Sequence, residues 1–166
     1  MGKKRNLPEA LHHVLFEIEM IIYSMMAFSK GNLRQFESNI LVEVFALHLR
    51  NLDEFFGRKQ SNSDYMKPEH FVEWRSDYRS NPEIMRRASH EISHLTYDRK
   101  APGEKEPWDA GKYFEPIRKE CIRFLELVSE NKELLEFQNN RTKHSEVLSI
   151  LRELTPIPNK GAGGND

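Results

Sequence analysis

Arginines and histidines that could act together in catalysis lie in one stretch, residues 82–98, with the sequence PEIMRRASHEISHLTYD. Arg87 and His94 are seven residues apart, so on an α-helix their side chains project almost in line. An arginine can stabilise the charge of a phosphate, and a histidine can transfer a proton near neutral pH. The spacing therefore predicts a phosphodiester site in which Arg87 and His94 are the candidate catalytic residues.

The same stretch contains a second pattern, HEISH, in which His90 and His94 are one helical turn apart. In zinc peptidases with this pattern the two histidines bind the metal, and the glutamate, here Glu91, acts as the base that activates a water. By spacing alone the third ligand would be Glu115 or Glu120. Such an enzyme also needs a sheet edge to hold its substrate, and the sequence predicts no strand. Zinc chemistry is therefore the alternative hypothesis, and we expect no metal or other cofactor.

Both patterns require residues 82–98 to form one helix. Asn81 can cap its start, and Pro82 suits the first helical position, where a missing N–H costs nothing. Pro102 and Gly103 follow its end. Apolar residues mark the stripe beside the polar one: Ile84, Ala88, Ile92 and Leu95.

Helical apolar periodicity also predicts the main elements on either side of this helix. They cover residues 8–28, residues 32 to about 56, residues 113–130 and residues 134–154, the last with a break near Asn139 and Asn140. Gly31 is expected to end the first helix, and Asn32 to open the second. The expected inner face of the second helix consists of Phe36, Ile40, Val44, Leu47 and Phe55. The later helix is expected to bury Ile117, Cys121, Phe124, Leu125 and Val128.

The predicted fold is all-α, an up-and-down helical bundle of four main helices plus one or two short helices. Residues 57–80 are polar and rich in turn residues, with a short helix expected within residues 68–78. The short connection between the first two helices predicts that they are antiparallel neighbours. We expect one domain over residues 1–154 and a disordered tail over residues 155–166.

Composition limits the function. Charged residues make up 31% of the chain, yet the net charge is only −1, which argues against a general nucleic-acid coat but leaves room for a local basic site. The single cysteine, Cys121, excludes an internal disulfide and a cysteine-based zinc site. Charged residues interrupt the apolar residues near the N-terminus, which argues against a signal peptide and a membrane span. We therefore expect a cytoplasmic protein that does not contact a membrane.

The end of the second predicted helix, HLRNLDEFFG, places Arg50 and Asn51 among apolar residues. They are candidates for substrate binding. The simpler interpretation is a solvated flank, in which Arg50 forms an ion pair with Glu54 one turn later.

Several short segments together resemble a known superfamily. HLRNLDEFF at residues 48–56, PEHFVEW at 68–74, HLTYDR at 94–99, Trp108 and a helix with Phe124 resemble a family of small bacterial HEPN-like proteins. An all-α bundle with R-x(4–6)-H near its third long helix is likewise similar to the HEPN superfamily. The resemblance covers roughly residues 48–124.

This resemblance implies that the protein is a metal-independent endoribonuclease or a non-catalytic RNA-binding relative of one. It also implies that the chain forms a homodimer and that its partner is RNA. By position, Arg87 and His94 would be the active pair. Arg50, Asn51, Tyr97 and Arg99 would be substrate-binding residues, with Tyr97 about 60° from His94 around the helix. Two alternatives remain beside this hypothesis: a non-catalytic helical protein-interaction module, and a small zinc metallopeptidase that uses HEISH.

Overall fold

The computed structural model describes residues 6–57, 65–93 and 108–154, and within these ranges it contains helices and no strand. The predicted all-α class is therefore confirmed. The elements are α1 (Leu7–Ser29), α2 (Gln35–Gly57), a 3-10 turn η1 (Pro68–His70), α3 (Pro82–Arg87), a π-helix η2 (Ala88–Ser93), α4 (Ala110–Val128), α5 (Lys132–Leu135) and α6 (Asn140–Glu153).

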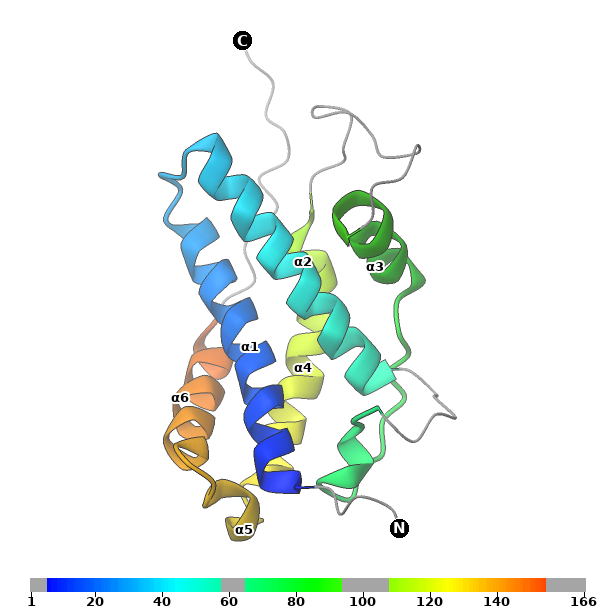
Figure 1. Cartoon of the computed structure of the whole chain (residues 1–166), viewed down its shortest axis with the longest axis vertical. Helices are drawn as coiled ribbons and strands as arrows, with labels where there is room; N and C mark the ends of the chain where they lie inside the picture. Colours follow the sequence, from blue (N-terminus) through cyan, green and yellow to red (C-terminus); the bar gives the residue numbers. More distant parts are fainter. Residues whose placement is uncertain (1–5, 58–64, 94–107, 155–166) are drawn as a thin grey trace.

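The chain runs up α1, down α2, back up through residues 65–93, down α4 and up α6 (Figure 1). Helices α1 and α2 are antiparallel neighbours, as the short connection between them predicts. Helix α1 also packs against α5 and α6, so it lies between α2 on one side and α6 on the other.

Helix α1 forms where its apolar periodicity predicts it. Its first turn is capped by Asn6, whose side chain accepts a hydrogen bond from the backbone N–H of Glu9. Its end is marked by Gly31, which has a φ of 70° and so adopts the left-handed conformation that favours glycine. The predicted glycine stop is confirmed. By length and hydropathy alone α1 could cross a membrane, but a core helix of a soluble protein meets the same criteria, and its apolar stripe is buried here.

The predicted inner face of α2 is largely wrong. Phe36, Ile40 and Leu47 are exposed, Val44 is half-buried, and only Phe55 of the expected set lies in the core. The stripe that is buried instead consists of Phe45, Leu49, Leu52 and Phe56, with Phe55 beside it.

The sequence of α2 explains this choice. Apolar residues occupy nearly every position between residues 40 and 49, so two stripes compete for the core. The stripe through Phe36 and Leu47 is interrupted by Glu43, Arg50 and Glu54, whose burial without partners would be costly. The start of α2 also differs from the prediction. The helix opens at Gln35 rather than after Asn32, because the Glu37 side chain accepts a hydrogen bond from the backbone N–H of Arg34.

The predicted short helix over residues 68–78 is reduced to the turn η1, and the chain beyond Phe71 has no helical structure up to Asn81. Phe71 and Trp74 are nevertheless buried, and their rings meet the ring of Phe124 on α4 edge to face. This segment is therefore fixed by packing rather than by local helical bonds.

Helix α4 begins at Ala110, so Pro116 lies inside the helix rather than near its start. Its predicted core residues are all buried: Ile117, Cys121, Phe124, Leu125 and Val128. Burial raises the pKa of the Cys121 thiol, which makes this cysteine a structural, unreactive residue.

The predicted break near Asn139 and Asn140 is confirmed, since α5 ends at Leu135 and α6 begins at Asn140. Asn140 is fully buried and holds three segments together. Its Nδ2 donates to the carbonyls of Pro8 and Leu134, at 2.9 and 3.0 Å, and its Oδ1 lies 3.0 Å from Nδ1 of His12. Residues 155–166 lie outside the described residues.

Candidate functional site

The start of α3, the helix that carries Arg87, is positioned by a buried carboxylate on α2. Asp53 is completely buried and accepts hydrogen bonds from the Tyr78 hydroxyl at 2.5 Å, from the Ser80 hydroxyl, and from the backbone N–H of Asn81 at 2.9 Å. Burial raises the pKa of Asp53, while these hydrogen bonds act in the opposite direction. Burial, followed by the hydrogen bond to Asp53, likewise raises the pKa of Tyr78. Asp53 therefore ties the extended segment before α3 to the end of α2.

A glycine allows this segment to approach α2 so closely. A Cβ on Gly57 would lie 2.2 Å from the backbone nitrogen of Ser80, and backbone cannot move aside as a flexible side chain can. Asn81 then caps α3, because its side chain accepts from the backbone N–H of Glu83 at 3.0 Å, and Pro82 occupies the first position. Both predictions for the start of this helix are confirmed.

Arg87 is the last residue of α3, and it is a buried residue. The residue is only 2% exposed, and its guanidinium lies over the ring of Trp108, 4.4 Å from the ring centre. This cation–π contact holds the guanidinium against the ring. The neighbouring Arg86 is exposed and pairs with Glu83 at 2.8 Å. The two adjacent arginines therefore have different environments.

The described part of the predicted helix, residues 82–93, is helical throughout, but it is not a regular α-helix. The α-helix ends at Arg87, and the next six residues form the π-helix η2. A π-helix has wider, i→i+5 turns, so a spacing of seven residues no longer places two side chains in line as it does on an α-helix. His90 lies on η2 with an exposed side chain. The candidate residues His94, Tyr97 and Arg99 lie outside the described residues, and the side chain of Glu91 is not described either.

The two proposed third ligands for zinc lie on α4 and have other partners. Glu115 pairs with Arg118 at 3.2 Å, and Glu120 accepts a hydrogen bond from the Ser76 hydroxyl at 2.7 Å. Within residues 6–57, 65–93 and 108–154, no three histidine, cysteine, aspartate or glutamate side chains group as a metal site would require. Because His94 is not among these residues, the zinc hypothesis stays a prediction.

Arg50 and Asn51 make polar contacts along α2 and with α1. Arg50 Nε donates to Glu54 at 3.1 Å, so the ion pair of the simpler interpretation is confirmed. Asn51 Nδ2 donates to the Glu17 carboxylate at 3.0 Å, and the same oxygen lies 2.7 Å from His48 Nδ1. Asn51 is thus part of a polar bridge between the two helices.

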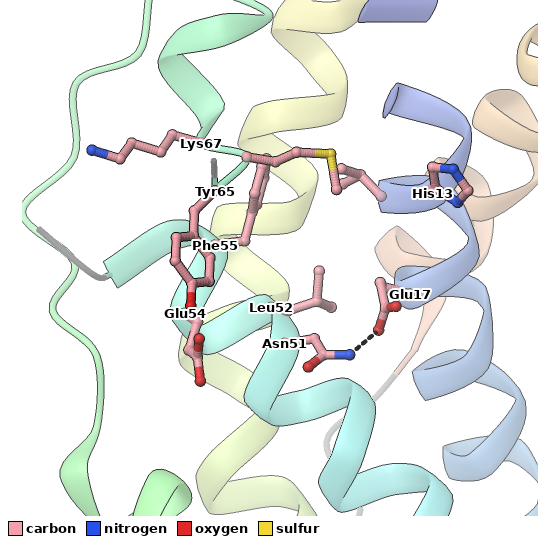
Figure 2. A pocket seen from close by; sticks show the side chains of 10 residues that line it. His13, Glu17, Asn51, Leu52, Glu54, Phe55, Tyr65 and Lys67 are labelled. Atoms are coloured by element: carbon pink, nitrogen blue, oxygen red, sulfur yellow. Dashed lines mark hydrogen bonds between the residues drawn. The ribbon is translucent and has the colours of Figure 1, made fainter. Parts of the chain in front are cut away.

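This bridge borders a pocket of about 240 Å³ between α1, the end of α2 and residues 65–67 (Figure 2). Its lining combines apolar side chains with two carboxylates: His13, Val14, Glu17, Asn51, Leu52, Glu54, Phe55, Tyr65, Met66 and Lys67. Figure 2 shows Asn51 and Glu17 facing each other from the two helices, while Lys67 extends away from them. Chemically, the pocket fits an apolar group that ends in a hydrogen-bond donor or a cation.

Of the pocket residues, sequence reasoning identifies only Asn51 as a binding candidate. The others come from three segments that are distant in sequence, and no spacing pattern joins them. Tyr65 and Met66 offer the one available signal, because they are large apolar residues at the end of an otherwise polar stretch, residues 57–64.

Comparison of the chain with models of known protein families, with curated proteins and with solved structures finds no match in any of the three. The resemblance to HEPN proteins, and the homodimer that it implies, therefore stay predictions.

Proposed function

We propose that this chain is a HEPN-like helical domain that binds RNA through the segment from Arg87 to His94. The observation that carries the proposal is the π-helix η2, which occupies the six positions between these two residues. π-Helical turns are rare and occur frequently at functional sites, because their geometry is maintained at a cost in stability. The irregular helix thus lies between the two residues that the sequence singles out.

The surroundings of Arg87 restrict its access to RNA. A guanidinium stacked on Trp108 and 2% exposed offers little surface to a phosphate unless its cover moves. A catalytic arginine must contact the phosphate as negative charge develops in the transition state. Binding and cleavage through Arg87 therefore both require this residue to become accessible when RNA is present, and we propose RNA binding as the primary function.

Binding of a labelled single-stranded RNA, measured by fluorescence anisotropy in EDTA, tests the proposal. We expect Arg87→Lys and His94→Ala to weaken binding about tenfold or more, because lysine lacks the planar fork of arginine. Arg86→Lys is the matched control on the adjacent, exposed arginine, and His90→Ala is the control for the histidine. Both controls should leave the Kd nearly unchanged. Thermal melting of each variant separates loss of binding from loss of fold.

The absence of RNA binding by the wild-type protein, or an equal loss in Arg86→Lys and Arg87→Lys, would contradict the proposal. The same samples report cleavage on a gel. If products form, loss of a general acid or base at His94 should lower the rate by a factor on the order of 100 to 10,000. If His90→Ala abolishes activity together with bound zinc, the zinc hypothesis replaces this one.

A further inference from the structure

The outer side of α2 carries apolar side chains that the bundle does not cover. Phe36 is 72% exposed, and Ile40 and Leu47 are each 45% exposed. At 100° per residue these three residues fall on one stripe, opposite the buried Phe45 and Leu49. The stripe is about 16 Å long between Phe36 and Leu47, at 1.5 Å per residue. Exposed large apolar residues that share one face, rather than occurring singly, mark an interaction site.

Helix α1 extends this apolar face beside α2. Phe16 and Tyr23 are exposed on the side of α1 that is turned away from its buried stripe. Figure 1 shows α1 and α2 side by side at the front of the molecule. We call the exposed residues Phe16, Tyr23, Phe36, Ile40 and Leu47 the outer face.

The charge around the outer face is negative. Helices α1 and α2 contain one basic residue, Arg50, and the following acidic residues that are not fully buried: Glu9, Glu17, Glu19, Glu37, Glu43 and Glu54. Lys30 and Arg34 add positive charge in the turn at one end, and Lys143 of α6 pairs with Glu19 and lies over the ring of Phe16. Glu43 lies within the stripe itself, between Ile40 and Leu47, and pairs with no residue that the structure describes.

From these observations we propose that the outer face docks a basic amphipathic helix of a partner protein. Such a helix would place its apolar side on Phe36, Ile40 and Leu47, as in helix-in-groove recognition. Its lysines or arginines would meet Glu43 and the carboxylates of Glu17 and Glu54. Glu17 and Glu54 line the pocket of about 240 Å³ between α1 and the end of α2. This pocket can receive one anchoring side chain of the partner helix.

Charge argues against the other occupants of this face. A second copy of the chain, bound about a two-fold axis through the stripe, would bring its Glu43 close to that of the first copy, and like charges within an interface disfavour it. Nucleic acid and anionic lipid would be repelled by the same carboxylates. This docking is independent of the RNA proposal, which concerns α3 and η2.

A labelled helical peptide of about 18 residues, five turns, tests the inference with the full chain. The peptide has leucines at spacings of three and four and lysines elsewhere, and its counterpart has glutamates in place of the lysines. We expect the basic peptide to bind and the acidic one not to bind, as followed by fluorescence anisotropy. Ile40→Ser, Leu47→Ser and Glu43→Lys should each raise the Kd of the basic peptide about tenfold or more.

Two matched controls make the test specific. Met26→Ser removes an apolar residue of almost the same exposure, 44%, which lies half a turn around α1 from Glu17 and so faces away from α2. Glu146→Lys reverses an exposed charge on α6. Neither control should change the Kd. The proposal is overturned if the wild type does not bind the basic peptide, if the controls weaken binding equally, or if Ile40→Ser converts a dimer into a monomer.

Discussion

At the scale of single residues, Asp53 provides the acceptor for three donors that reach it from residues 78–81. Asp53→Ala would leave the hydroxyls of Tyr78 and Ser80 and the N–H of Asn81 without this acceptor inside the protein. We expect the free energy of unfolding to fall by about 3 kcal/mol, the scale for a broken buried network. Asp53→Asn keeps an acceptor oxygen and should cost much less. Urea denaturation of the three proteins checks this.

The raised pKa of Asp53 also predicts a dependence on pH. The folded protein holds this proton more tightly than the unfolded chain, whose Asp53 titrates near the ordinary value of 3.8. Its contribution to stability is therefore complete below that pH and is lost as the pH rises through the folded pKa. We expect the difference in unfolding free energy between wild type and Asp53→Asn to shift in favour of the variant as the pH rises from 3.8. A difference that does not change with pH would contradict the shift.

Gly57 gives a second prediction at this scale. A methyl group at this position would overlap the backbone of Ser80, so Gly57→Ala should destabilise the protein by about 2 kcal/mol. Gly31→Asn is the control, since a Cβ at Gly31 meets nothing within 4 Å and asparagine tolerates a positive φ. Thermal melting should show a clear loss for Gly57→Ala and a small change for Gly31→Asn. Equal melting temperatures would refute the close approach.

At the scale of elements, the change from α3 to the π-helix η2 predicts uneven protection of backbone amides. A six-residue π-helix has few internal hydrogen bonds, whereas α4 spans 19 residues with a fully buried stripe. We expect amides of residues 88–93 to exchange with deuterium much faster than those of residues 117–125, as measured by mass spectrometry. Added RNA should slow exchange in the first segment if the proposed function is correct. Equal protection of both segments would contradict a separate π-helical element.

The elements also show which features of the fold can be predicted from the sequence and which cannot. Helices α1 and α4 were predictable because each has one apolar stripe, and Asn81 with Pro82 marked the start of α3. The buried face of α2 was not predictable in this way, because apolar residues surround the helix and only the charges at positions 43, 50 and 54 distinguish the two stripes. The extended course of residues 72–81 depends on Asp53, a contact across more than 20 residues that periodicity does not encode.

The candidate site likewise has features that the sequence predicts and features that depend on the fold. Arg87 and Asn51 were identifiable as unusual polar residues in helical sequence, but the stack on Trp108 and the pocket beside Glu17 depend on segments brought together by folding. The change to a π-helix had no local signal that propensity or spacing could reveal. A motif interpreted on an ideal α-helix therefore assumes a geometry that residues 88–93 do not have.

At the scale of the whole molecule, Asn140 joins α1, α5 and α6 through one buried amide. Asn140→Asp removes the two N–H donors and places a carboxylate beside the carbonyls of Pro8 and Leu134. We expect a loss of about 3 kcal/mol, or roughly 10 °C in melting temperature. Asn139→Asp is the control, because this neighbouring side chain is exposed and makes no capping hydrogen bond. If both variants melt together, the amide does not join the three helices energetically.

The same junction bears on how the protein is made in the cell. Asn140 bonds to residues that precede it by 128 and 132 positions, so α1 cannot complete its contacts until the last described helix has been synthesised. At about 5–20 residues per second, translation of that interval takes on the order of 10 s. Throughout that time the apolar stripe of α1 has α2 beside it but not α6, and a nascent chain in that condition is a natural client for a chaperone.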